Sequence, residues 1–211
     1  MKQITIFGAS GKLGRKCIAD AITRGFHVKA PTRTPIPFPG MIESLEAIQT
    51  TFDDSESLRS VIRDSQGVII ALGPRSSNAP AIFASLTTNI IRAMEAEGVQ
   101  RLVCVTGAMI GDLPVRRTKF FQRLTNFINS HAPELAKDRT EQEHVIQRSS
   151  LDWTIVKPPR LTDSPVSGKV KAAPDLEVGL LSKISRKDLA QYILNELESP
   201  NYIRQAVVVH Y

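Results

Sequence analysis

The sequence is poor in cysteine and has no long apolar run. Two cysteines stand among its 211 residues, so no disulfide framework is indicated, and we expect Cys17 and Cys104 to be buried free thiols on a helix and a strand. The longest apolar runs, such as residues 68–72, fall far short of the ~20 residues that a membrane-spanning helix needs. A strand pattern begins within a few residues of Met1, where a signal peptide would lie, and we therefore expect a cytoplasmic protein.

Aromatic residues and metal ligands are also scarce. Aromatic residues make up 6% of the chain and no nucleic-acid recognition motif is present, so no nucleic-acid partner is expected although the formal net charge is +6. The positive charge would equally attract an anionic dinucleotide. The four histidines show no metal-ligand spacing, and no metal site is predicted; they are His27, His131, His144 and His210.

A glycine-rich turn near the N-terminus is the most informative motif. A strand pattern over residues 4–7 leads into three glycines spaced G-x-x-G-x-x-G, and a helical pattern follows over residues 13–23. The N-terminus of such a helix offers unpaired N–H groups to an anion. We assign Gly8 to the sharp turn, Gly11 to the approach of a pyrophosphate and Gly14 to close helix–strand packing. The predicted cofactor-binding residues of this turn are Gly8, Ser10, Gly11, Lys12, Leu13 and Gly14.

The end of the second strand, predicted over residues 27–32, indicates which dinucleotide is bound. An acidic residue at this point suits the ribose hydroxyls of NAD, whereas a basic residue accommodates the 2′-phosphate of NADP. Arg33 stands here, and no acidic residue occurs before Glu43. The planar guanidinium of Arg33 matches a phosphate, so we predict NADP(H), with a solvated surface arginine as the alternative.

The order of predicted elements indicates an α/β fold. Strands over residues 44–52, 68–72 and 101–106 alternate with helices over residues 56–63 and 80–97. With short connections, this order predicts a Rossmann-like, doubly wound and mainly parallel sheet with helices on both faces. We expect a single NAD(P)-binding domain over residues 1–211.

Several candidate site residues follow strands and therefore share one edge of the predicted sheet, where ligands of such folds bind. Asp53 is expected on the adenine side, although Asp54 and Ser55 would also cap the next helix. Arg75 would contact phosphate or substrate, or lie exposed in its loop. The other residues of this group are Leu72, Gly73, Thr106 and Gly107.

The second half of the chain is predicted to cover the substrate side, through residues 107–180. Residues 115–130 mix basic and apolar side chains at helical spacing, and we expect a helix that faces the core or the pocket; a membrane-surface helix is the alternative. Residues 163–174 are predicted to form a long loop over the site. Helices are expected over residues 140–149 and 185–197, the second capped by Ser185, and strands over residues 153–157 and 206–209.

Four segments carry a family resemblance: Phe7-Gly8-Ala9-Ser10-Gly11, the Leu72-Gly73 step, residues 151–158 (Leu-Asp-Trp-Thr-Ile-Val-Lys-Pro) and residues 185–190 (Ser-Arg-Lys-Asp-Leu-Ala). They resemble the atypical short-chain dehydrogenases of the NAD(P)H-binding, NmrA-like group, and within it the single-domain biliverdin-IXβ/flavin reductases. The resemblance covers nearly the whole chain and implies an NADP(H)-binding fold. It also implies roles by position for Gly8, Ser10, Gly11 and Leu13 at the pyrophosphate, Arg33 at the 2′-phosphate, Asp53 near the adenine, Arg75 after the Leu-Gly step, and Thr106 and Pro159 beside the nicotinamide.

The chain departs from these relatives at the reaction end. They carry a serine where this chain has Gly107, and a histidine where it has Arg160. The Tyr-x-x-x-Lys pair, which donates a proton to carbonyl substrates in the main short-chain dehydrogenases, is absent, so an ordinary ketone is a poor candidate substrate.

These features predict an NADPH-dependent reductase that transfers hydride to a flat acceptor, namely a flavin, a quinone or a biliverdin-like molecule. FMN or FAD would be a substrate and not a prosthetic group. Arg160 is predicted to stabilise the developing anion, next to Thr106 and Gly107. The alternative is a non-catalytic NADP(H)-binding redox sensor of the NmrA-like kind that acts through a protein partner. An epimerase is less favoured, because no C-terminal substrate domain is predicted.

Overall fold

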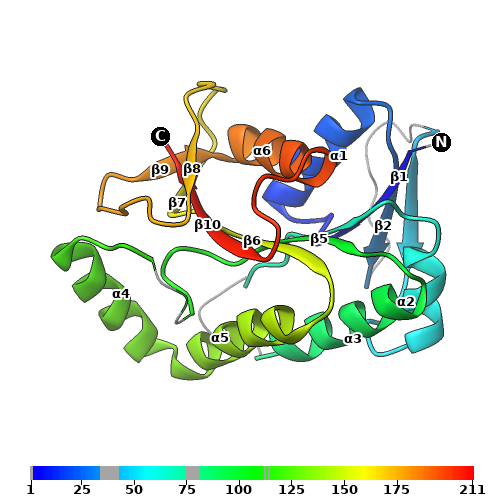
Figure 1. Ribbon diagram of the computed structural model, residues 1–211, viewed down its shortest axis with the longest axis horizontal. Coiled ribbons are helices and arrows are strands. Elements are labelled where there is room, and N and C mark those ends of the chain that lie inside the picture. Colours follow the sequence, from blue (N-terminus) through cyan, green and yellow to red (C-terminus); the bar gives the residue numbers. More distant parts are fainter. Residues whose placement is uncertain (1, 34–42, 75–80, 112, 114) are drawn as a thin grey trace.

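The computed structural model of the chain describes residues 2–33, 43–74, 81–111, 113 and 115–211. Within these residues, an eight-stranded sheet lies between two layers of helices (Figure 1). The strand order is β3-β2-β1-β4-β5-β6-β10-β8. All neighbouring strands are parallel except β8, which runs antiparallel to β10 at the edge. The predicted Rossmann-like, mainly parallel fold is therefore confirmed.

The bounds of the elements follow from the backbone hydrogen bonds. The strands are β1 (Gln3–Phe7), β2 (His27–Thr32), β3 (Leu45–Gln49), β4 (Val68–Ile70), β5 (Arg101–Val105), β6 (Asp152–Lys157), β7 (Arg160–Thr162), β8 (Lys171–Ala173), β9 (Lys183–Ser185) and β10 (Gln205–His210). The helices are α1 (Lys12–Thr23), α2 (Ser55–Ile62), α3 (Phe83–Ala96), α4 (Lys119–His131), α5 (Pro133–Arg148) and α6 (Arg186–Glu198).

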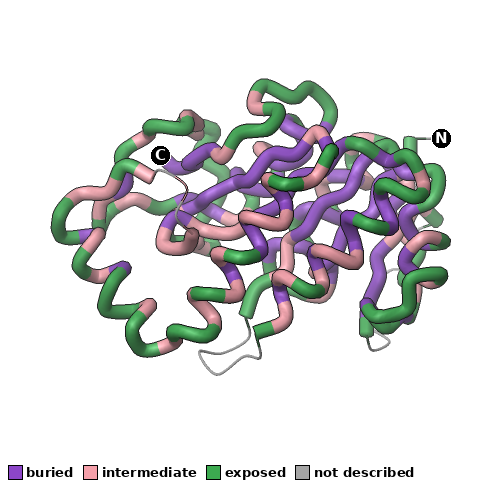
Figure 2. The backbone as a smooth tube through the Cα atoms, turned by 60° about the horizontal axis from the view of Figure 1, so that its bottom comes forward, coloured by how far each residue is buried: buried purple, intermediate pink, exposed green. Residues whose placement is uncertain are grey.

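Each face of the sheet has its own core because successive side chains of a strand point to opposite faces. Ile4 and Ile6 of β1 pack with α1 and α6 in one core, whereas Phe7 packs with α2 and α3 in the other. β4 shows the same division, with Ile69 in the first core and Ile70 in the second. The buried residues run along the strands through the middle of the molecule (Figure 2). The apolar run at β4 is thus buried on both faces, as predicted for a central parallel strand.

The direction of the strand order reverses next to β1. The chain moves from β1 outward through β2 to β3, then crosses to β4 on the other side of β1. The carboxyl ends of β1 and β4 therefore form the switch point at which ligands of doubly wound folds bind.

Local capping signals were predicted correctly. The side chain of Asp54 accepts hydrogen bonds from the backbone N–H groups of Glu56 and Ser57, and so caps α2. The Ser185 hydroxyl caps α6 in the same way, by accepting from Asp188. Cys17 and Cys104 are buried free thiols, and burial raises the pKa of each to about 12.

Two predictions in the second half of the chain need correction, and one feature was missed. Helix α5 begins at Pro133, where a proline in the first turn fits a helix start, and not at residue 140. The segment 163–174 is not wholly a loop, because Lys171–Ala173 pairs with β10 as an edge strand. A second, two-stranded sheet of β7 and β9 was not predicted at all.

Helix α4 also differs from its prediction. The helix begins at Lys119, because Thr118 caps it. Its buried residues are Phe121 and Thr125, whereas 65% of Phe120 and 62% of Phe127 are exposed. The expected core-facing side is therefore only partly confirmed: Phe121 packs in a small core, whereas Phe120 and Phe127 on another side of α4 are exposed. Among the described residues, no helix is long and apolar enough to span a membrane.

Candidate functional site

A cavity of about 630 Å³ lies along the carboxyl edge of the sheet. This volume falls within the roughly 300–1,000 Å³ of typical ligand pockets. Predicted site residues from five separate segments line it: Gly8, Ser10, Gly11, Lys12, Leu13, Arg33, Leu72, Gly73, Thr106, Gly107 and Pro159. The fold thus brings most of the predicted residues to one cavity.

The glycine turn is built by close backbone contacts. Gly8 has a φ of +85°, and a Cβ atom there would lie 2.6 Å from the Ala71 carbonyl oxygen. A Cβ atom on Gly14 would overlap the Gly8 carbonyl oxygen, so a glycine is needed for α1 to approach β1. The Gly11 N–H donates to the Gly8 carbonyl at 3.0 Å and closes the turn. Gly14 therefore shapes the turn without lining the cavity.

The N-terminus of α1 is free to bind an anion. Gly11 is its N-cap residue, no described side chain caps it, and its first turn has no acidic residue. The first N–H groups of a helix have no partner within the helix, and they carry partial positive charge. They lie at the cavity next to Ser10, Lys12 and Leu13, where a diphosphate would fit.

The charges at the cavity are of one sign. Its charged lining residues are Lys12, Arg33, Arg139 and Arg186, and no acidic residue belongs to the lining that the structure describes. A cleft lined by positive charges attracts and retains anionic ligands. Arg33 follows β2 directly, is exposed, and lies at the place predicted for the 2′-phosphate.

Arg139 of α5 was missed from the sequence, because the predicted helix began one residue after it. Its side chain is buried and donates to the backbone carbonyls of Leu72 at 3.3 Å and Thr106 at 2.9 Å. The guanidinium also stacks 4.6 Å from the ring centroid of Phe83, and burial lowers its pKa. Arg139 therefore joins the carboxyl ends of β4 and β5, and it forms part of the cavity wall.

Arg186, the first residue of α6, is a second cavity residue that the sequence did not single out. Its guanidinium donates to Asp163 at 2.8 Å, and Lys12 forms a longer ion pair of 3.7 Å with the same carboxylate. The hydrogen bond from Arg186 holds the pKa of Asp163 below its usual value. The sequence did contain a signal for this position. The predicted cap at Ser185 makes Arg186 the first residue of the helix.

A buried acid–base pair lies directly behind Thr106. The Thr106 hydroxyl donates to Glu143 Oε1 at 2.6 Å, and Lys157 Nζ donates to the same oxygen at 2.5 Å and to the Ile110 carbonyl at 2.7 Å. The side chains of Glu143 and Lys157 are 0% and 1% exposed. Burial lowers the pKa of Lys157, while the carboxylate of Glu143 opposes this shift.

Glu143 is only partly satisfied. Its second oxygen, Oε2, is buried and has no hydrogen-bond partner among the residues described. A Cβ atom on Gly111, which has a φ of +75°, would overlap this oxygen. This pair was not predicted from the sequence, since Lys157 stands at the end of a strand, where a charged residue is ordinary, and Glu143 lies on a polar helix.

Besides Gly14, two predicted residues do not line the cavity. Arg160 on β7 is exposed, whereas the next residue, Leu161, lines the cavity; this follows from the alternation of side chains along a strand. Asp53 is exposed, and the preceding Phe52 lines the cavity in its place. Arg75 lies outside the described residues.

Known proteins share both sequence and fold with this chain. An uncharacterised chloroplastic protein of Arabidopsis thaliana is 26% identical over 221 residues, which cover 94% of this chain and 74% of the relative. A short-chain dehydrogenase/reductase from Veillonella parvula, solved in complex with NADP, has a TM-score of 0.80 at 19% identity and covers 100% of this chain and 94% of its own. ChuY, an anaerobilin reductase from Escherichia coli O157:H7, has a TM-score of 0.80 at 20% identity over 99% of this chain and 96% of its own.

These two structures show a shared fold, and the family follows from the sequence. The sequence model of the NAD(P)H-binding protein family matches residues 8–200 of this chain, from the first glycine of the turn to just beyond the end of α6. The match includes the N-terminus of α1, the end of β2 and the whole cavity edge. This chain belongs to the NAD(P)H-binding family.

Proposed function

We propose that this protein is an NADPH-dependent oxidoreductase that transfers hydride to a flat acceptor such as a flavin, a quinone or a biliverdin-like molecule. One observation carries the proposal: the described lining of the cavity holds four basic side chains, no acidic one, and an uncapped helix N-terminus behind a glycine turn. This arrangement suits a ligand with several phosphates.

The residues that would hold NADP(H) are spread along the cavity. The turn from Gly8 to Leu13 would bind the diphosphate through backbone N–H groups, and Arg33 would bind the 2′-phosphate. Thr106 and Pro159 would flank the nicotinamide, in line with the family resemblance. Parts of residues 107–180 would form the substrate side, since Gly107 and Leu161 line the cavity from this range.

NADPH supplies the hydride when it is bound, so the protein has to orient two planar groups and exclude side reactions. Gly107 lines the cavity without a side chain, and a Cβ atom there would already be in van der Waals contact with Ile110 at 3.8 Å. The described lining contains no tyrosine, histidine or carboxylic acid to protonate an alkoxide. A flavin or quinone suits such a site, because its reduced anion is delocalised and takes a proton from water.

Arg186 replaces Arg160 in this proposal as the cation near the acceptor. It lines the cavity and its charge is held in place by Asp163. A fixed cation stabilises negative charge as it develops on an acceptor. Arg160 lies on the other face of β7 and takes no part.

The test is a spectrophotometric assay of NADPH oxidation with FMN, riboflavin and a water-soluble quinone in turn. We expect NADPH oxidation that depends on both protein and acceptor and that is faster with NADPH than with NADH at equal, subsaturating concentrations. The absence of oxidation above the protein-free rate with every acceptor would overturn the proposal.

The lack of a general acid in the described lining also supports the second candidate, an NADP(H)-binding sensor without turnover. Binding measured by calorimetry together with no oxidation of NADPH, and capture of a protein partner by one redox form of the dinucleotide but not by the other, would favour the sensor.

A further inference from the structure

Helix α4 presents an apolar stripe to solvent. Phe120 and Phe127 are seven residues apart, so they lie on the same side of the helix, and Ile128 lies next to Phe127. Their exposed fractions are 65%, 62% and 42%. Phe121 and Thr125 lie roughly 100–140° around the helix from Phe120, and they hold that other side of α4 against the protein. The stripe is therefore not needed for the packing of the helix.

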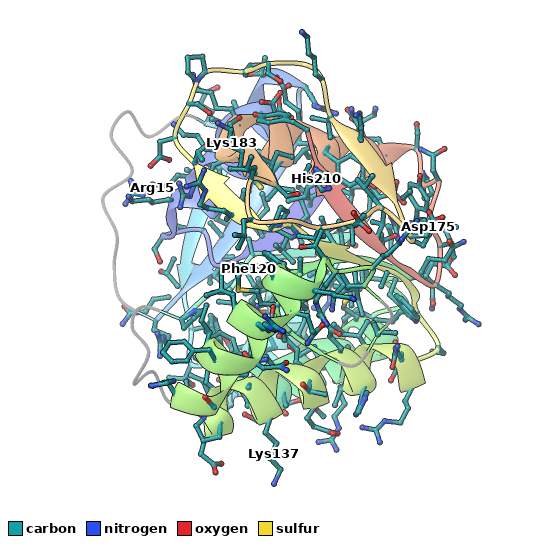
Figure 3. All side chains as sticks on the ribbon, turned by 90° about the vertical axis from the view of Figure 1, so that its left-hand side faces the viewer. Arg15, Phe120, Lys137, Asp175, Lys183 and His210 are labelled. Atoms are coloured by element: carbon teal, nitrogen blue, oxygen red, sulfur yellow. The ribbon has the colours of Figure 1, made fainter. Side chains whose placement is uncertain are left out.

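A neighbouring turn extends this apolar surface. Arg117 forms a β-bridge with Val178, and the Thr118 N–H donates to the Val178 carbonyl at 3.0 Å, which places the turn after Val178 next to the start of α4. In this turn Leu181 is 88% exposed and Leu180 is 45% exposed. α4 and this turn lie together at one end of the molecule (Figure 1), and Figure 3 looks onto that end, with Phe120 near its centre. We call Phe120, Phe127, Ile128, Leu180 and Leu181 the α4 surface.

The charges around the α4 surface are mainly positive. Helix α4 contains Lys119 and Arg123 but no acidic residue, and both basic residues are exposed. Arg116 precedes the helix and pairs with Glu177 at 3.5 Å. A symmetric contact between two copies of α4 would bring Lys119 and Arg123 close to the same charges of the partner, which is unfavourable. Lys119 and Arg123 have no ion-pair partner within the described parts of the chain. Apolar residues beside such basic ones instead match a surface with an apolar interior and anionic groups above it.

We propose that the α4 surface docks this protein peripherally on an anionic lipid membrane. The two phenylalanines and Leu181 would enter the boundary between headgroups and acyl chains, while Lys119 and Arg123 would lie at the level of the lipid phosphates. Helices with one apolar side and one basic side bind membranes in this orientation, without spanning them. The proposal is independent of catalysis, since none of these residues lines the cavity.

The test is sedimentation of the full chain with vesicles of phosphatidylcholine alone or mixed with phosphatidylglycerol. We expect binding to the mixed vesicles that weakens with salt, and a loss of about fivefold for each of Lys119→Glu and Arg123→Glu. Phe120→Ser with Phe127→Ser should abolish most of the binding. The matched controls are Lys16→Glu on α1, which makes the same charge change, and Ile203→Ser, which removes an apolar residue that is 43% exposed at the amino end of β10.

A second measurement reports on insertion and on folding. Phe127→Trp adds a tryptophan at the α4 surface, whereas the native Trp153 is buried. Its emission should shift to shorter wavelength with mixed vesicles and be quenched by brominated lipid.

Two outcomes would overturn the proposal. Equal binding losses for Lys16→Glu and Lys119→Glu would mean that net charge alone attracts the protein to the vesicles, and this would overturn the proposal. A dimer in solution that Phe120→Ser dissociates would identify a second copy as the occupant and would also overturn it. NADPH affinity should stay unchanged in every variant, as proof of folding.

Discussion

The Thr106 hydroxyl donates a hydrogen bond of 2.6 Å to Glu143, a buried carboxylate on a different element. Lys157 donates to the same carboxylate oxygen, so a threonine at the cavity is held by a buried ion pair. Thr106 follows β5, Glu143 lies on α5 and Lys157 ends β6. The pair therefore holds the part of the cavity wall that Thr106 forms, and it links this wall to the stability of the fold.

Glu143→Gln should destabilise the protein, because it leaves the ammonium of Lys157 buried without a counter-charge. Breaking a buried pair from one side costs about 3–5 kcal/mol of unfolding free energy. Denaturant unfolding would measure the loss. Combining Glu143→Gln with Lys157→Met should recover part of it, since the unpaired charge is then gone. A double variant as unstable as the sum of the single variants would contradict the ion-pair interpretation.

Arg33→Ala should weaken NADPH binding by about 1–3 kcal/mol and leave NADH binding nearly unchanged, because NADH has no 2′-phosphate for a charge-assisted hydrogen bond. Calorimetric titration of both dinucleotides would measure the difference. Arg160→Ala serves as the control, since it removes an exposed arginine outside the cavity lining. Equal losses for NADPH and NADH would refute the role of Arg33.

Arg186→Ala and Arg160→Ala should differ in their effect on turnover. Arg186 lines the cavity and Arg160 does not, so we expect Arg186→Ala to lower kcat for flavin or quinone reduction at least tenfold, or about 1.4 kcal/mol in barrier. Arg160→Ala should keep the wild-type rate. If Arg160→Ala is the slower variant, the interpretation that the Arg160 side chain points away from the cavity is wrong.

Gly14→Ala should disturb the phosphate-binding turn, because its Cβ atom would overlap the Gly8 carbonyl oxygen. Overpacking of this kind costs roughly 1–3 kcal/mol, and the displaced α1 should bind NADPH more weakly. Thermal unfolding and dinucleotide titration would show both effects. Gly73→Ala is the matched control for stability, since a Cβ atom there meets nothing within 4 Å. Wild-type stability in Gly14→Ala would contradict the close-packing role.

Acid should destabilise the protein partly through Asp188. Burial disfavours the ionised form of its carboxylate, but hydrogen bonds from Tyr211, Ser185 and the backbone of residues 167 and 168 outweigh burial and lower the pKa. A lowered pKa in the folded state means stability that is present above the unfolded pKa of about 3.9 and is lost as pH falls through the folded value.

Asp188→Asn should therefore be less stable than wild type near neutral pH and should lose less stability on acidification. Denaturant midpoints at about pH 6, 4 and 3 should fall less steeply with falling pH for the variant than for wild type. Asp175→Asn, at an exposed aspartate, is the control and should follow the wild-type curve. If Asp188→Asn lost as much stability on acidification as wild type does, this residue would be excluded as a source of the acid sensitivity.

The sequence by itself determined the features that depend on neighbouring residues. Each of these features depends on a few consecutive residues and could therefore be predicted. They are the glycine spacing, Arg33 directly after β2, and the helix caps at Asp54 and Ser185. The order of strands and helices then placed the strand ends at one edge, since parallel strands joined by short right-handed crossovers have few other arrangements.

The tertiary structure alone decided which side chains meet across that edge. Arg139 and Arg186 reach the cavity from two different helices, and the Glu143–Lys157 pair meets Thr106 behind the cavity wall. No local spacing in the sequence encodes such contacts. Leu161 lines the cavity and Arg160 does not, because β7 pairs with β9. This long-range pairing determines which side chains of β7 point toward the cavity. Likewise the pattern of α4 predicts an amphipathic helix, but only the packing of Phe121 and Thr125 determines that Phe120 and Phe127 face outward.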